Sequence, residues 1–349
     1  MFEYDSEEDP KKILIIRLSA MGDVLLTTPL LRLLKKKFPE AEIDFLVKQE
    51  YSSLISTNPY IHQIWIFSQS NNFFEFIKLC LQMRNIQYDG IIDLQVNVRS
   101  FFLWILSNAK WKVRYKPWRW KRFLLVHLHR NYYKTDMPVP LRFLSALLPW
   151  GIQDDGLGLE LKVDEKAKCV VRSHMKNRGI GLMNRIVVLA PGASKMTKRW
   201  PSENYAAVGN YCNSRNYKVV LVGGDQDCQA CEKVTKAMDM LPENFSGKLS
   251  FQETAALVAE SDLLVTNDTG VMHMGSALKK KVVAIFGPTT HHLGFMPFRT
   301  HSIVVEKSLS CRPCSYHGTD ICSQGHFRCM KDIQVEDVIQ AAKNLLDEK

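Results

Sequence analysis

An acidic side chain stands at the first strand-to-helix loop that the sequence predicts. The segment from Ser19 to Asp23 follows an apolar run at 11–17, and Gly22 permits a tight turn just before Asp23. A carboxylate in this position can cap the helix by accepting hydrogen bonds from backbone N–H groups. It can also act as a general base on an acceptor hydroxyl group. The spacing alone leaves both roles open.

A second loop gathers positive charge and hydroxyl groups. It follows the apolar run at 185–190 and includes Ser194, Lys195, Thr197, Lys198 and Arg199. Three cations and two hydroxyls within six residues suit a ligand that carries phosphate. The alternative is a solvated basic loop without a ligand.

A third loop lies between an apolar strand at 262–266 and the predicted helix at 270–279. Backbone amides at the start of that helix offer an anion site around Thr269 and Gly270, and Asp268 can accept hydrogen bonds from sugar hydroxyls. The alternative is that Asp268 only caps the helix. His273 falls one turn further on, where it is either a ligand-binding or a packed histidine.

Short apolar strands alternate with helical patterns on both sides of these loops. Four strands are predicted in the first half and four in the second, with a restart after the glycine-containing stretch at 151–158. The alternation predicts an α/β fold with two Rossmann-like domains, each built on a parallel sheet. One continuous helix is predicted over 24–38. Ligands of such sheets bind at the carboxyl ends of the strands, so we expect the active site in the cleft between two facing domains.

The expected boundaries follow from the same pattern. They are a flexible extension at 1–10, an N-terminal domain at 11–160, a C-terminal domain at 161–334 and a last helix at 335–349 that packs back on the N-terminal domain. Neither Gly-x-Gly-x-x-Gly after a strand nor Gly-x-x-x-x-Gly-Lys-Ser/Thr is present. These absences argue against a dinucleotide oxidoreductase and against a P-loop enzyme.

The net charge of +10 comes from one stretch of the chain. Residues 94–135 contain ten Lys and Arg and no acidic residue, so the remaining 36 basic and 36 acidic residues balance. The same stretch carries ten aromatic residues. Cations interleaved with aromatics can bind single-stranded nucleic acid or an anionic membrane surface, or simply form a solvated basic face.

The nine cysteines and the absence of a secretory signal predict a reducing cytoplasm. No apolar run reaches the roughly 18 residues that span a bilayer. Four cysteines lie within nineteen residues, at Cys311, Cys314, Cys322 and Cys329. They could hold a structural metal ion, although the second arm lacks the usual short spacing, or remain free thiols in a packed loop.

Taken in order, these segments resemble a known family, the lipopolysaccharide heptosyltransferases of glycosyltransferase family 9. The segments that carry the resemblance are Leu18-Ser-Ala-Met-Gly-Asp-Val-Leu-Leu-Thr-Thr-Pro29, Lys198-Arg-Trp-Pro201, Asn267-Asp-Thr-Gly-Val-Met-His273 and Phe286-Gly-Pro-Thr289. The resemblance runs from about residue 12 to residue 345, and the Gly22-Asp23 and Asp268-Thr269-Gly270 blocks are its most specific parts.

The resemblance implies a GT-B fold and an inverting transfer of L-glycero-D-manno-heptose from ADP-heptose to the inner core of lipopolysaccharide. Asp23 matches the family's proposed base and Lys198 its diphosphate-contacting lysine. Asp268, Thr269 and Gly270 match the block that holds the donor.

A looser match makes Gly223, Gly224 and Asp225 the ribose-and-base loop. Asp225-Gln-Asp227 spells an Asp-x-Asp triplet, but the family is regarded as metal-independent, so we expect no required cofactor or metal ion.

The family's acceptor is an acidic glycolipid on the inner leaflet of the inner membrane of Gram-negative cells. It makes the basic stretch an acceptor and membrane surface, with Lys116, Arg119, Lys121 and Arg122 as its contact residues. The chain is then expected to be a cytoplasmic, peripherally membrane-associated monomer that binds no nucleic acid. The cysteine loop favours a heptosyltransferase II-like member. The alternatives are a family 9 enzyme that uses another nucleotide sugar and, in a different class, a basic nucleic-acid-binding module.

Overall fold

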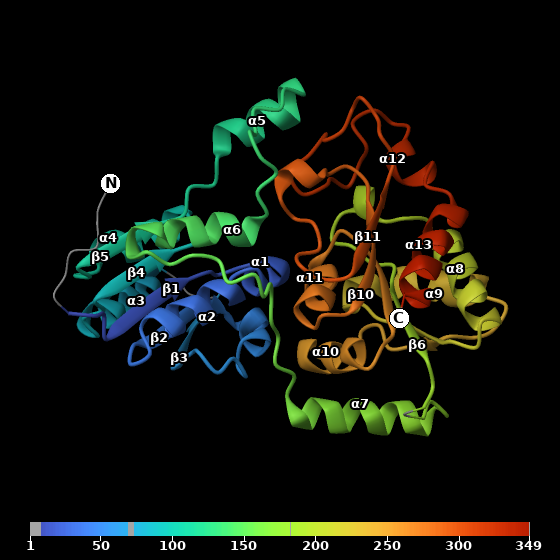
Figure 1. The fold of residues 1–349 in the computed structure, drawn as a ribbon, viewed down its shortest axis with the longest axis horizontal. Helices are drawn as coiled ribbons and strands as arrows, with labels where there is room; N and C mark the ends of the chain where they lie inside the picture. Colours follow the sequence, from blue (N-terminus) through green and yellow to red (C-terminus); the bar gives the residue numbers. More distant parts are fainter. Residues whose placement is uncertain (1–7, 69–72, 182, 349) are drawn as a thin grey trace. The chain divides into compact units, whose positions relative to one another are not determined.

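The computed structural model describes residues 8–68, 73–181 and 183–348. The chain divides into two compact units, and each unit is built on one parallel sheet (Figure 1). The first unit comprises Met1–Trp118 and Val139–Lys162, and the second comprises Arg119–Pro138 and Val163–Lys349. The change of unit after Lys162 lies close to the predicted boundary at 160.

The sheet of the first unit has the strand order β3-β2-β1-β4-β5. Its strands are β1 (Lys12–Ile16), β2 (Glu42–Lys48), β3 (Gln63–Phe67), β4 (Gly90–Asp93) and β5 (Trp111–Arg114). The central strand β1 pairs in parallel with β2 and with β4, and its last four residues are completely buried. The sequence pattern missed β5, because its four residues are all half-buried and lie inside the basic stretch.

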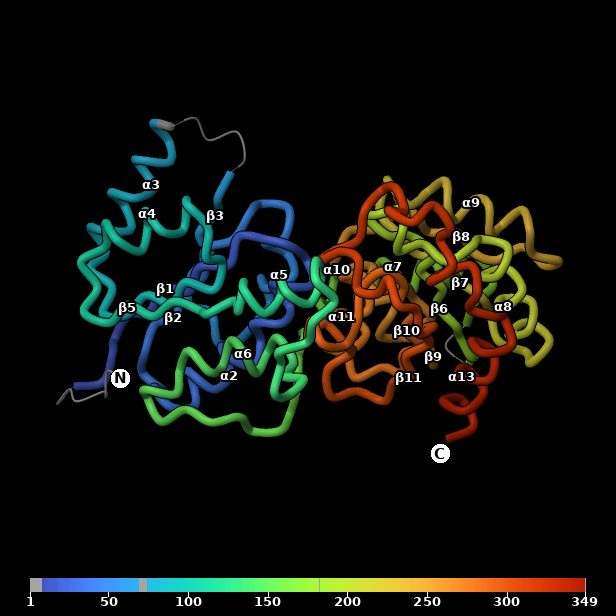
Figure 2. The backbone as a smooth tube through the Cα atoms, turned by 90° about the horizontal axis from the view of Figure 1, so that it is seen from above, coloured from blue at the N-terminus to red at the C-terminus, as the bar shows by residue number. Residues whose placement is uncertain are grey.

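Helices cover both faces of this sheet, as Figure 2 shows. They are α1 (Met21–Leu25), α2 (Thr28–Lys37), α3 (Phe73–Asn85), α4 (Val98–Leu106) and α6 (Val139–Leu144), with 3-10 turns at Gln49–Leu54 and Ser145–Trp150. Residues from α3 and α4 share one apolar core with β1, β2 and β4, whereas α2 packs with α6.

The single helix predicted over 24–38 is wrong, because the chain forms two helices there. Pro29 lies in the first turn of α2 and has no N–H to donate to the carbonyl of Leu25 four residues earlier. The Thr28 hydroxyl donates to that carbonyl instead, at 2.9 Å. The break gives Asp23 a short helix of its own.

The second unit has a six-stranded parallel sheet in the order β11-β10-β9-β6-β7-β8. Its strands are β6 (Ile186–Ala190), β7 (Lys218–Leu221), β8 (Glu243–Asn244), β9 (Leu263–Asn267), β10 (Lys281–Phe286) and β11 (Ser302–Glu306). Its helices are α5 (Arg119–Leu128), α7 (Glu165–Asn177), α8 (Ser202–Ser214), α9 (Cys228–Ala237), α10 (Phe251–Ala259), α11 (Gly270–Ala277), α12 (Arg328–Lys331) and α13 (Val335–Asp347). Helices α8, α9 and α13 lie on one face of the sheet, and α10 and α11 lie on the other (Figure 1).

The last helix packs on the sheet of the second unit. Helix α13 lies against α8, β9, β10 and β11, and its expected contact with the N-terminal domain stays a prediction. Val338, Ala341, Ala342 and Leu345 form a buried apolar stripe on this helix and join the core of the second sheet. A stripe at this spacing must be covered, and the nearest apolar surface is the sheet that the helix follows.

Part of the basic stretch also belongs elsewhere. Residues 119–138 were expected within the N-terminal domain but belong to the second unit. The Arg122 guanidinium lies over the ring of Tyr316 at 4.9 Å, and Asp136 contacts His292 at 2.6 Å. These contacts join residues more than 150 positions apart, so no local pattern in the sequence could indicate them.

Candidate active site

The predicted base, Asp23, forms an ion pair with Arg17. Oδ2 of Asp23 lies 2.6 Å from Nη2 of Arg17, and 22% of the Asp23 side chain is exposed. Ala20 is the N-cap residue of α1 and Asp23 is its third residue, so Asp23 contributes to capping as the N3 member of a capping box. The carboxylate accepts only a long contact, at 3.5 Å, from the Ala20 backbone N–H. Its side chain is therefore positioned by a guanidinium and remains open to solvent.

The end of β1 and the end of β4 together hold this loop in place. Nη1 of Arg17 donates to the carbonyl of Leu94 at 2.5 Å. The side-chain oxygen of Gln95 accepts hydrogen bonds from the backbone N–H groups of Leu18 and Ser19, at 3.0 and 3.3 Å. Arg17, which contacts Asp23, and Gln95, which holds the loop, thus lie at the carboxyl edge of the sheet, where α/β folds place their ligand sites.

In the second unit, the predicted donor residues Lys198 and Asp268 contact each other directly. Nζ of Lys198 lies 2.7 Å from Oδ2 of Asp268, and the side chains are only 12% and 6% exposed. The hydroxyl of Thr289 donates to the same carboxylate oxygen at 2.7 Å. Three loops that follow β6, β9 and β10 therefore meet at one carboxylate.

Asn267 fastens two of these loops to each other. Its amide nitrogen donates to the carbonyls of Pro191 and Gly192, at 2.9 and 3.2 Å, and its amide oxygen accepts from the backbone N–H of Trp200 at 3.2 Å. Asn267 is fully buried, so all of these partners lie inside the protein. The resulting frame fixes the loop that carries Lys198.

Helix α11 begins directly after Asp268 and presents its first amides beside the Lys198 pair. Thr269 is its N-cap residue and Gly270 its first helical residue. No side chain caps this end of the helix. The N–H groups of a helix start attract anions, and the role of Thr269 and Gly270 in binding the donor stays a prediction.

The glycine loop after β7 packs closely against the loop after β6. Gly192 and Gly223 both lie so close to Asp227 that a Cβ atom would fall 2.1 Å and 2.6 Å from it. Asp227 accepts a hydrogen bond from the Gly224 N–H at 3.1 Å, and burial raises the pKa of Asp227 above its ordinary value. Asp225, in contrast, is exposed. The two carboxylates of the Asp-x-Asp triplet thus have separate surroundings.

The remaining predicted donor residues differ in how open they are. Ser194 and Gly224 are exposed, whereas Thr197 is buried and exchanges hydrogen bonds with Thr319 through its hydroxyl. His273 is buried and lies edge-on to the ring of Phe295 at 6.4 Å. Thr197 therefore joins the cysteine-containing loop to the Lys198 loop and does not present its hydroxyl to solvent.

The predicted acceptor residues divide between the two units. Lys116 belongs to the first unit and Arg119 to the second, and both are exposed. Lys121 and Arg122 are half-buried and lie over the rings of Tyr133 and Tyr316. Lys116 and Arg119 are therefore the more exposed of the four.

None of the nine cysteines forms a disulfide bond. Burial raises the pKa of Cys329 to about 11 and also raises the pKa of Cys314, and the neighbouring thiols add to both shifts. Sγ of Cys311 lies 3.9 Å from Nε2 of His326. A metal ion at this cluster stays a prediction, as does the free-thiol alternative.

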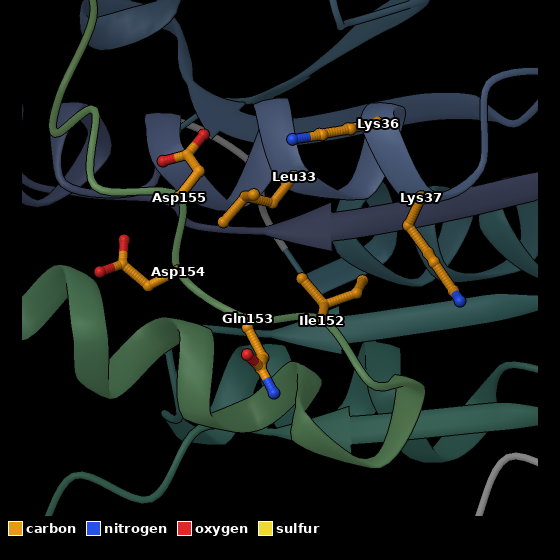
Figure 3. Close-up of a pocket in the computed structure, with 7 residues that line it drawn as sticks. All are labelled: Leu33, Lys36, Lys37, Ile152, Gln153, Asp154 and Asp155. Carbon is orange, nitrogen blue, oxygen red and sulfur yellow. The ribbon is translucent and has the colours of Figure 1, made fainter.

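A hollow of about 310 Å³ lies in the first unit, between the end of α2 and the stretch that follows Trp150 (Figure 3). The residues that line it are Leu33, Lys36, Lys37, Ile152, Gln153, Asp154 and Asp155. None of them belongs to the predicted site. The end of α2 leads into the start of β2, so the hollow borders the amino-terminal edge of the sheet. Asp23 follows the end of β1 and therefore lies at the opposite edge.

Two contributors to the site were missed from the sequence. Arg17 could have been found as a charged residue that ends an otherwise apolar strand. Thr289 lay within a recognised motif, but its bond to Asp268 spans 21 residues and leaves no local signal. In the described part of the chain, no helix is both long enough and apolar enough to cross a membrane.

Comparison with known proteins gives consistent results. The profile of glycosyltransferase family 9 (heptosyltransferase) matches residues 76–321. Lipopolysaccharide heptosyltransferase 3 of Escherichia coli K12 is 28% identical over 341 residues, covering 94% of this chain and 96% of that protein. Lipooligosaccharide heptosyltransferase 2 of Campylobacter jejuni serotype O:2 is 28% identical over 347 residues, covering 96% and 98%.

Among solved structures, the ADP-heptose LPS heptosyltransferase II of E. coli matches with a TM-score of 0.75 and 23% identity, covering 96% of this chain and 98% of that one. This likeness confirms the predicted α/β class, with two parallel Rossmann-like sheets of the GT-B type.

Proposed function

Because this chain belongs to glycosyltransferase family 9, the heptosyltransferase family, we propose that it transfers L-glycero-D-manno-heptose from ADP-heptose to the inner core of lipopolysaccharide, with inversion. Heptosyltransferase activity in the synthesis of the lipopolysaccharide core is what the family and its curated relatives share. The donor, the stereochemical course and the base belong to the proposal. A similar solved enzyme is itself described as acting with ADP-heptose, which supports this choice of donor.

In the proposed reaction, an acceptor hydroxyl attacks the anomeric carbon as the bond from that carbon to the diphosphate oxygen breaks. Asp23 takes the hydroxyl proton, and ADP leaves with the bonding electron pair. The ion pair with Arg17 supports this role, because it orients a carboxylate that stays accessible to solvent. A base must lie within hydrogen-bond reach of the proton that it removes, so this positioning matters to the rate.

The observation that carries the proposal is the pairing of Lys198 with Asp268 at the start of α11. The ammonium group and the first amides of the helix are suited to a departing diphosphate, whose negative charge grows as the bond breaks. Asp268 and Thr289 would bind hydroxyl groups of the donor. The lysine supplies positive charge without a bound cation, so we propose a transfer that needs no divalent metal ion.

The decisive experiment compares ADP-heptose with UDP- and GDP-sugars by product analysis, for the wild type, Asp23→Asn and the control Glu50→Gln. Glu50 is an exposed carboxylate of the same unit, and it contacts Lys48 at 3.6 Å. We expect Asp23→Asn to lower kcat by about 10²–10⁴. Its ADP affinity should remain, because the residues proposed to bind the donor lie in the other unit.

Wild-type turnover by Asp23→Asn would remove the proposed base. Preferred turnover of a UDP- or GDP-sugar would identify a family member with another donor. Activity that EDTA abolishes and Mg²⁺ or Mn²⁺ restores would disprove the metal-independent course.

Helix α4 supports a peripheral place for the enzyme at the membrane that carries its acceptor. Val98, Phe101, Phe102 and Ile105 recur at helical spacing, and all four are exposed, Val98 by 72%. An apolar helix face beside basic residues is typical of proteins that rest on anionic lipid. We propose that the protein acts at the cytoplasmic face of the inner membrane, and that it does so as a monomer.

Replacing Lys116 and Arg119 with Gln should weaken binding to anionic vesicles by about 2 kcal/mol, or roughly 30-fold, since each exposed cation contributes about 1 kcal/mol. Co-sedimentation at low salt measures this change. The pair Lys121→Gln and Arg122→Gln is the matched control and should have a smaller effect, because aromatic rings already cover both side chains. Equal binding by the wild type and by the Lys116 and Arg119 variant would contradict the proposal.

A further inference from the structure

Two adjacent histidines and an aspartate converge beside the loop that follows β10. Nε2 of His291 lies 3.5 Å from Oδ2 of Asp136, and Nδ1 of His292 lies 2.6 Å from Oδ1 of the same carboxylate. Over residues 8–68, 73–181 and 183–348, this is the one group of three His, Cys, Asp or Glu side chains whose ligand atoms all lie within 4.8 Å of one another. We infer that these three side chains bind a divalent transition-metal ion of the Zn²⁺ type.

The spacing suits a tetrahedral ion. Bonds of about 2.0–2.2 Å from Zn²⁺ to nitrogen and oxygen place neighbouring ligand atoms about 3.3–3.5 Å apart. The separation between His291 and Asp136 already has this value. The shorter contact between His292 and Asp136 is a hydrogen bond, and it would have to open by less than about 1 Å to admit the ion.

The donor set and its surroundings favour the same kind of ion. Two imidazoles and one carboxylate suit Zn²⁺, Co²⁺ or Fe²⁺ rather than Mg²⁺ or Ca²⁺, which prefer oxygen ligands. The second ring nitrogen of His291 faces Oε1 of Glu306 at 3.8 Å, and Arg312 holds that carboxylate at 2.6 Å. Carboxylates beyond the ligand shell commonly orient metal-binding imidazoles in this manner.

The position of the site indicates what a bound ion would do. Asp136 lies in residues 119–138, and the histidines follow β10 closely, as does Thr289, which bonds to Asp268. All three side chains are partly exposed, His292 least at 28%, so an ion can enter from solvent. The ion would fasten the basic segment 119–138 to the loop that carries Thr289. This role is separate from the transfer chemistry, and its test does not depend on turnover.

The test is a Zn²⁺ titration of the full-length protein after removal of metal with EDTA, followed by calorimetry. We expect the variant His291→Gln/His292→Gln to bind one equivalent fewer than the wild type. The control His301→Gln, at an exposed histidine of the same unit, should bind as the wild type does. Because cysteine thiolates can also bind Zn²⁺, a Cys311→Ser/Cys314→Ser variant is titrated in parallel.

Two further readouts separate the candidate ligands. The equivalent that the histidine variant loses should persist in the cysteine variant, and Co²⁺ bound there should lack thiolate charge-transfer absorption. Equal stoichiometry in the wild type and the histidine variant would overturn the inference. Loss of that same equivalent in the cysteine variant would also overturn it.

Limited trypsin digestion tests the proposed fastening. Arg130 and Lys134 are exposed cleavage sites within the segment that Asp136 would anchor. Where cleavage requires the segment to open, Zn²⁺ at 100 times its Kd should slow cutting by about 100-fold in the wild type. The histidine variant should show no such protection. Equal protection of both proteins would place the ion elsewhere and refute the inference.

Discussion

A methyl group added at Gly192 would collide with a carboxylate that has little room to move. The Cβ atom of an alanine there would lie 2.1 Å from Cγ of Asp227 and 2.2 Å from its Oδ1. Asp227 is held by the Gly224 N–H at 3.1 Å and faces Arg199 at 3.8 Å. The Gly192→Ala variant must therefore displace either Asp227 or the loop that leads to Lys198.

The cost of this displacement can be worked out from its parts. Overpacking of a well-packed site costs about 1–3 kcal/mol. Loss of the hydrogen bond to the Asp227 carboxylate adds about 1.5–3 kcal/mol. A shift of the loop relieves part of the overpacking cost and part of the hydrogen-bond cost. We expect a total of about 2–4 kcal/mol, which corresponds to a fall in Tm of roughly 4–16 °C for a unit of this size.

Gly224→Ala is the matched control, because it lies in the facing loop and its Cβ atom would meet nothing within 4 Å. Its φ of −76° is open to any residue. Urea denaturation should show Gly224→Ala within about 0.5 kcal/mol of the wild type. The KM for the nucleotide sugar should rise in Gly192→Ala, since the same loop carries Lys198.

The double variant Gly192→Ala/Asp227→Gly separates the collision from other effects. Replacing Asp227 with Gly removes the three atoms that would lie nearest to the added methyl group. The double variant should therefore be less destabilised than the sum of the two single variants. The reasoning would be refuted if Gly192→Ala were as stable as Gly224→Ala, or if the two single effects simply added.

Two other predictions follow from charged pairs. Replacing Lys198 with Met should lower kcat/KM by about 10²–10³, because the variant loses a group that stabilises the developing charge. Lys195→Met should have little effect, because the pair of Lys195 with Asp320 is exposed. Steady-state kinetics with ADP-heptose test this prediction, and equal losses in the two variants would contradict it. The Arg32 guanidinium lowers the pKa of Asp155 to about 2 from an ordinary 3.8, so the pair stabilises the fold above pH 4 and loses its effect as the pH falls toward 2. Asp155→Asn should lose about 1–2 kcal/mol at pH 7, and the difference from the wild type should shrink below pH 4 in urea titrations, whereas a constant difference would count against the pair.

Local patterns in the sequence sufficed for the elements that carry the site. The apolar runs around β1, β6, β9 and β10 were predictable, because buried parallel strands are continuously apolar. The loops after these strands were recognisable as candidate ligand loops, since such ligands bind at the carboxyl ends of strands. The break at Pro29 and the half-buried strand β5 were not predicted. At Pro29, the Thr28 hydroxyl donates the hydrogen bond that the missing N–H cannot donate. Strand β5 forms because it pairs with β4.

By itself, the sequence determined the fold class, the family and most of the residues that the proposed reaction uses. The tertiary structure decided how those residues are held: Arg17 against Asp23, and Lys198 and Thr289 against Asp268. It also decided that residues 119–138 belong to the second unit and that α13 covers the second sheet. The physical reason is the range of the forces involved. Strand and helix patterns arise from neighbours a few positions apart, whereas an ion pair or a packed methyl group depends on which distant segments folding brings within a few ångströms.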